Sequence, residues 1–106
     1  MAGLLKCVCM RNYVLDVGNS IEFPTSTSFI VITSEGGTFL GSAALIAGYG
    51  ISENSIKIIS NTSTVIGIGA NFPLRITRPS QWEIIRLTNN DTISHALSIT
   101  YIHYPK

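Results

Sequence analysis

The stretch that decides the fold reads His-Ala-Leu-Ser-Ile-Thr-Tyr-Ile-His-Tyr over residues 95–104, ten residues without a charge. Successive side chains of a β-strand point to opposite faces, and β-branched and aromatic residues favour strands. One face of this stretch carries His95, Leu97, Ile99, Tyr101 and His103. The other face is uncharged as well. The stretch therefore predicts a strand that is apolar or small on both faces.

Similar segments recur along the whole chain, in which Ile, Val, Thr, Tyr, Phe and Trp account for 40 residues. Turn clusters of Gly, Pro, Asn, Asp and Ser separate them, which is typical of an all-β protein. Strands are expected over 4–10, 13–17, 29–33, 38–47, 55–59, 64–68, 74–77, 82–88 and 95–104. The spacing predicts an antiparallel β-sandwich, jelly-roll-like, of about eight to nine strands. A short helix over 43–47 is the alternative there, because Ala and Leu favour helices.

Length and composition bound the organisation of the chain. With 106 residues, one domain spanning 1–106 is expected. The formal net charge is +1 and like charges do not cluster, so no nucleic-acid partner is expected. The longest charge-free stretches, 36–52 and 58–74, are broken by glycines or by polar residues. They fall short of a membrane span, and we expect no membrane insertion. The first residues also lack the pattern of a signal peptide.

Charge is scarce throughout the sequence, with 45% hydrophobic residues against 12% charged. A folded chain of this mass exposes roughly 5800 Å², so charged side chains would be widely spaced on its surface. Strands that are apolar on both faces need a second cover, which predicts a homo-oligomer. The residues expected at the subunit interface are Phe39, Leu45, Leu97, Ile99 and Tyr101.

Residues able to carry chemistry are scattered. The acidic residues stand singly, and His95 and His103 would lie roughly 27 Å apart on one extended strand. Three copies of one histidine across a symmetry axis remain an alternative ion site. Cys7 and Cys9 share a strand face, where a disulfide between them would be strained, and we expect two reduced thiols. A metal site there would need further ligands. The sequence thus predicts no enzyme, no metal site and no cofactor.

Two aromatic residues stand in loops, where a ring can reach solvent and stack on a ligand. Tyr49 lies between two glycines, and Phe72 precedes a proline. Plugging one end of the sandwich is the structural alternative for either ring. Asp91, in Asn89-Asn90-Asp91, is most simply a turn former. Trp82 is expected in the core or at an interface rather than on a sugar-binding platform.

The rhythm of these segments resembles the tip or knob domains of bacteriophage tail fibres and tail needles. The resemblance spans roughly residues 29–89 and is carried by FIVIT at 29–33, AALIAGYG at 43–50, SIKII at 55–59, VIGI at 65–68 and WEIIRLTN at 82–89. It implies a trimeric β-sandwich in a virion that recognises a receptor on the host surface. Such tips usually follow a long fibrous stalk, whereas strands begin almost at once here.

The expected function is therefore a non-enzymatic, homotrimeric virion module that binds a host-surface glycan or protein. The expected receptor-binding residues lie in loops and are Tyr49, Asn54, Asn71, Phe72 and Asp91. A free-standing carbohydrate-binding module or a small capsid-associated structural protein is the alternative. The sequence does not separate these two classes.

Overall fold

The computed structural model describes residues 5–24, 26–36, 41–47, 55–69, 71–78 and 84–104. About two thirds of them lie in nine strands. The strands are β1 (Lys6–Leu15), β2 (Ser20–Phe23), β3 (Thr27–Ser34), β4 (Ser42–Ala47), β5 (Ile56–Asn61), β6 (Ile66–Ile68), β7 (Leu74–Thr77), β8 (Ile85–Asn89) and β9 (His95–His103). No helix in this part of the chain has the length and apolarity that crossing a membrane would require.

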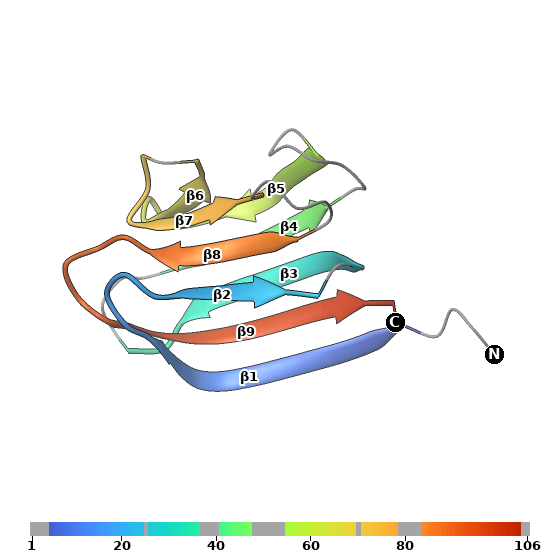
Figure 1. The fold of residues 1–106 in the computed structure, drawn as a ribbon, viewed down its shortest axis with the longest axis horizontal. Helices are drawn as coiled ribbons and strands as arrows, with labels where there is room; N and C mark the ends of the chain where they lie inside the picture. The colour runs from blue at the N-terminus through green and yellow to red at the C-terminus, as the bar shows by residue number, and fades with distance from the viewer. Residues whose placement is uncertain are drawn as a thin grey trace.

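The strands form two sheets that face each other (Figure 1). One is five-stranded, in the order β1-β9-β3-β4-β5, and the other is four-stranded, in the order β2-β8-β7-β6. All pairs are antiparallel except β6 with β7. The predicted antiparallel β-sandwich is confirmed. Early and late strands pair in both sheets, β1 with β9 and β2 with β8, as in a jelly roll, while β3, β4 and β5 follow one another as a meander.

The core lies between the sheets and is built almost entirely from aliphatic side chains, because alternate residues of each strand point inward. Its fully buried members include Leu45, Leu97 and Ile99, each with no exposed surface. We expected these three residues at a subunit interface, and that assignment is wrong for them, because they fill the interior of their own subunit. Tyr101 is partly buried, with its ring edge-on to that of Phe23 at 5.2 Å between centroids.

The alternative of a helix over 43–47 is also wrong, since this segment lies inside β4. Ala43 and Leu45 are buried, while Ala44 is partly exposed and Ile46 retains 44% of its surface. The burial pattern thus alternates along the strand, and β4 is paired on both sides, with β3 and β5. Neighbouring strands enforce the extended form over the local preference of Ala and Leu. Phe39, the remaining residue expected at the interface, lies outside the described residues.

The outer face of the five-stranded sheet is poor in charge across its three central strands. Pairing places Ile102 of β9, Phe29 of β3 and Ile46 of β4 in one row across the sheet. Two residues further along each strand, the next row on the same face consists of Thr100, Val31 and Ala44. We refer to these six residues as the outer apolar face. Along β3, β4 and β9 these residues alternate with core residues, so their side chains point away from the space between the sheets.

A β-bulge divides β1, where the pairing with β9 shifts between Met10 and Tyr13. Asn12 there has a φ of 53°, in the left-handed region that asparagine tolerates better than most residues. Glu35, after β3, accepts the Asn12 backbone N–H at 2.6 Å and an Arg11 guanidinium N–H at 2.8 Å. These bonds, with that from Arg11 the larger cause, lower the pKa of Glu35. The bulge lets one strand continue where we expected two, over 4–10 and 13–17.

Candidate functional site

Three connections gather at one end of the sandwich, which we call the loop end: the β1–β2 turn (16–19), the β6–β7 connection (69–73) and the β8–β9 loop (90–94). The Gly18 N–H donates to the Asn89 carbonyl at 2.8 Å, and the Asn89 N–H donates to the Asn19 carbonyl at 2.9 Å. The Asn90 N–H donates to the Pro73 carbonyl at 2.7 Å. The backbone therefore joins all three connections.

The loop end is at the opposite end of the sandwich from the first residues of β1 and the last residues of β9. Lys6 and His103 are paired at the far end of the five-stranded sheet. Figure 1 shows the β8–β9 loop and the β1–β2 turn on the left, whereas β1 begins and β9 finishes on the right. The chain thus enters and leaves the described fold at one end and presents these connections at the other.

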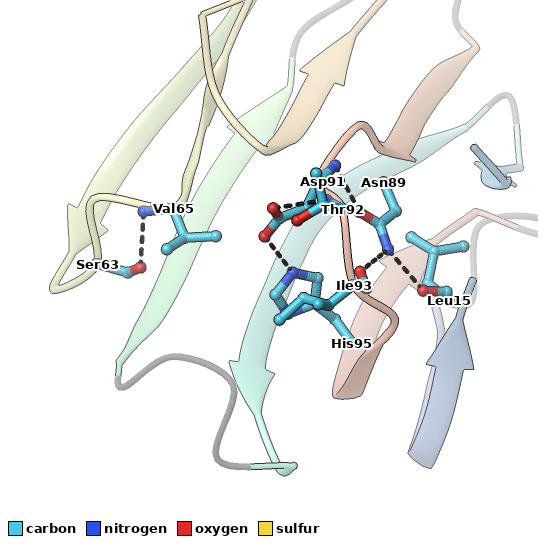
Figure 2. A network of polar contacts seen from close by, with 8 residues as sticks. All are labelled: Leu15, Ser63, Val65, Asn89, Asp91, Thr92, Ile93 and His95. Carbon is cyan, nitrogen blue, oxygen red and sulfur yellow. Dashed lines mark hydrogen bonds and ion pairs between the residues drawn. The ribbon is translucent and has the colours of Figure 1, made fainter. Parts of the chain in front are cut away.

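The side chain of Asn89 joins several segments of the loop end by hydrogen bonds (Figure 2). It is fully buried, and its amide nitrogen donates to the carbonyl of Leu15 at 2.8 Å and to that of Ile93 at 2.9 Å. Its amide oxygen accepts the Asp91 backbone N–H at 2.9 Å. One side chain therefore joins the finish of β1 to both halves of the β8–β9 loop. In the sequence, this asparagine lies in a turn cluster and is not among the expected site residues.

Asp91 forms the turn that the sequence predicted and also binds His95. Its Oδ1 accepts the Thr92 backbone N–H at 2.7 Å, and its Oδ2 lies 2.9 Å from Nε2 of His95. An ionised carboxylate only accepts, so Nε2 carries the proton. The Thr92 N–H and, after it, the His95 bond lower the pKa of Asp91. The ionised form therefore stabilises the folded loop, and this contribution is lost as pH falls through the lowered pKa.

His95 binds Asp91 of the β8–β9 loop from a buried position in the protein. Only 1% of its surface is exposed, because it occupies the first core-facing position of β9, opposite Leu15. A ligand in solvent cannot reach that ring. The spacing of four between Asp91 and His95 was visible in the sequence, but the bend that brings them together depends on Asn89. We therefore assign the pair to holding the loop rather than to chemistry on a substrate.

Two of the four remaining expected receptor-binding residues belong to the described part of the chain. Asn71 is exposed in the β6–β7 connection, and Phe72 beside it is partly buried. Tyr49 and Asn54 lie outside the described residues. The described residues that flank them, Ala47 and Ile56, are paired on the five-stranded sheet. The structure thus brings Asn71, Phe72 and Asp91 to the loop end.

The Phe72 ring packs against Gly67 of β6 in place of reaching freely into solvent. A Cβ added at Gly67 would overlap three carbons of that ring. A glycine within a strand leaves room for a close approach, and the Phe72 ring occupies that room. Gly67 stands between the core-facing Ile66 and Ile68, so the Phe72 ring lies on the outer side of the four-stranded sheet. Asn71 is left as the exposed member of the pair.

Replacing Gly67 with alanine should displace the Phe72 ring and lower the free energy of unfolding by about 1–3 kcal/mol, the usual cost of overpacking. Urea unfolding of the purified chain measures this. When Phe72 is already alanine, the same change at Gly67 should cost less than about 0.5 kcal/mol, since the obstacle is gone. An equal cost in both backgrounds would contradict the contact.

Among the described residues, no group of three or more His, Cys, Asp or Glu side chains is placed to hold a metal ion. The loop end instead presents amide and hydroxyl groups, with Asn71, Asn90 and Thr92 exposed. Ser94 also donates to Asp16 at 2.9 Å, which fastens the β8–β9 loop to the β1–β2 turn. Such a surface can exchange neutral hydrogen bonds with a ligand. Comparison with protein-family models, curated proteins and solved structures gave no match.

Proposed function

We propose that this chain is a non-enzymatic adhesive module of a virion, which contacts a host-surface glycan or protein through the loop end. One observation carries the proposal: loops distant in sequence are fixed together by hydrogen bonds, at the end opposite to that where β1 begins and β9 finishes. A knob on a fibre needs this polarity, with attachment at one end and recognition at the other. The resemblance of the strand rhythm to phage fibre tips agrees with it.

The module acts as a homotrimer in this proposal, with the outer apolar face covered by neighbouring subunits. Leu45, Leu97 and Ile99 serve the core, so the contact falls to the opposite side of the same strands. Phe29, Val31 and Ile102 are only partly buried within the subunit, and Ile46 is exposed. A trimeric mass by light scattering at micromolar concentration is the expected result. A stable monomer would favour the alternative, a free-standing carbohydrate-binding module or a small capsid-associated protein.

Recognition is tested by glycan-array binding and by adsorption of the labelled chain to host cells. Asn71→Ala and Asn90→Ala each remove an exposed amide from the loop end, and we expect each to weaken binding by at least about tenfold. Lys6→Ala is the control, because Lys6 is exposed at the start of β1, at the end opposite to the loop end. If both loop variants bind as the unmodified chain does, the loop end is not the recognition surface.

A further inference from the structure

A second feature lies near the opposite end of the molecule, where Cys7 and Cys9 stand on β1. Both are free and exposed. Pairing sets Cys7 beside Ile102 and Cys9 beside Thr100, so both thiols point to the outer side of the five-stranded sheet. β1 is the edge strand of that sheet, with β9 as its neighbour. In the single subunit, both thiols are therefore exposed on the edge strand, beside the outer apolar face.

The two thiols are neighbours as well as being on the same face. Cys7 and Cys9 are two residues apart on β1, opposite Ile102 and Thr100, which are likewise two residues apart on β9. The ladder with β9 is continuous from Lys6 to Met10, so the backbone holds both side chains in register. The sulfur pair is thus presented by a regular strand rather than by a loop.

Strand geometry favours an ion over a disulfide at this pair. Residues two apart on a strand are separated by about 6.6 Å at Cα, and their side chains run parallel. A relaxed disulfide needs the two Cβ atoms about 3.8 Å apart. A metal ion between two thiolates holds the sulfurs about 4.6 Å apart, if each metal–sulfur bond is about 2.3 Å. Two parallel side chains on one strand can bring their sulfurs to about 4.6 Å by a change of rotamer, without a change of the backbone.

The described part of the chain offers no third side-chain ligand beside the two thiols. His103, near Cys7, faces the other side of the sheet, where its ring lies 5.8 Å from that of Tyr101. No third Cys, His, Asp or Glu side chain among the described residues joins the pair in a group that could hold a metal. Zn²⁺ in proteins takes four ligands, whereas soft thiolates select Cu(I). Cu(I) also accepts two thiolates in a line.

We propose that Cys7 and Cys9 form a dithiolate site for a soft, two-coordinate cation, with Cu(I) as the matching ion. On binding, each thiol loses its proton to water and each sulfur donates a pair of electrons to the ion. The complex then carries one negative charge, and no oxidation state changes. The site is independent of the proposed recognition surface, because it lies at the other end of β1 and shares no residue with the loop end.

The test is an anaerobic titration of the reduced full chain with Cu(I), in competition with a chromophoric Cu(I) chelator. We expect one ion per chain, with a sulfur-only first shell of two atoms by X-ray absorption. Cys7→Ser and Cys9→Ser should each reduce the affinity at least about 100-fold, because one thiolate alone does not satisfy the ion. Zn²⁺ should bind at least about 100-fold more weakly than Cu(I).

Two controls make the result decisive. Thr100→Ala alters the cross-strand neighbour of Cys9 without removing sulfur, and its affinity should match that of the unmodified chain. The double variant Cys7→Ser/Cys9→Ser gives the background, since the chain has only two cysteines. Binding no tighter than this background would overturn the proposal. So would one ion shared by two chains with a doubled mass, because the ion would then bridge copies. Circular dichroism verifies that each variant is folded.

Discussion

Replacing Asn89 with alanine should lower the free energy of unfolding by about 3 kcal/mol. The side chain is fully buried and takes part in three hydrogen bonds, to Leu15, Ile93 and Asp91. Alanine removes all three and leaves buried carbonyl groups without a donor, which costs more than the loss of an exposed hydrogen bond. The loop end should loosen first, because the bonds converge on it.

Urea unfolding followed by circular dichroism measures the effect, and amide hydrogen exchange locates it. Asn90→Ala is the matched control, because the neighbouring side chain is exposed and should contribute less than about 0.5 kcal/mol. We expect faster exchange at Asp91 and Gly18 in the Asn89 variant. If Asn89→Ala unfolds at the same urea concentration as Asn90→Ala, the buried amide does not hold the loops together.

Replacing Ile99 with alanine should lower the free energy of unfolding by about 2–5 kcal/mol, as expected for a large buried aliphatic residue. Ile99 has no exposed surface and lies on β9, which has a neighbouring strand on each side. The surrounding strands cannot close the cavity without disturbing their hydrogen-bond ladders. Ser98→Ala, on the outer side of the same strand, should cost less than about 1 kcal/mol.

The concentration dependence of unfolding separates a core role for Ile99 from an interface role. A core residue lowers stability by the same amount at every protein concentration, whereas an interface residue acts through association. We expect the loss in Ile99→Ala to persist in dilute solution, where any oligomer has dissociated. A loss that disappears on dilution would return Ile99 to the subunit interface.

Strand alternation carried most of the fold prediction. The segment over 74–77 matches β7, and that over 95–104 matches β9 to within one residue. β2 was missed, because its four residues stand between two turn clusters and include the charged Glu22. The parallel pairing of β6 with β7 was not anticipated either. A connection of five residues rarely joins parallel neighbours, and no local pattern announces it.

The prediction failed at the choice of face. In β9 both sets of alternating residues are uncharged, so the pattern located a strand without saying which side the core would take. Leu97 and Ile99 were given to an interface and lie in the core. Over residues 97–100, the larger Leu97 and Ile99 fill the space between the sheets, and the smaller Ser98 and Thr100 turn outward. Side-chain volume would have been the better guide.

The loop end was foreseen in part. Asp91 and Phe72 were singled out from turn chemistry, and the structure brings their loops together. Asn89 was not, because its three partners lie in separate segments and a turn-forming asparagine looks the same in sequence whether exposed or buried. The contact of His95 with Asp91 was not foreseen for the same reason. Both depend on contacts across the end of the sandwich, which periodicity does not record.

The position of β9 between β1 and β3 also bears on how the protein is made. During synthesis, β1 and β3 leave the ribosome long before the strand that joins them, so the larger sheet cannot close until the segment from His95 onward has emerged. Pairings this distant in sequence form slowly, since a long loop must close first. Until then β1 has an unpaired edge on both sides, open to other nascent copies. Completion of the last strand is thus the step that commits the chain to its fold.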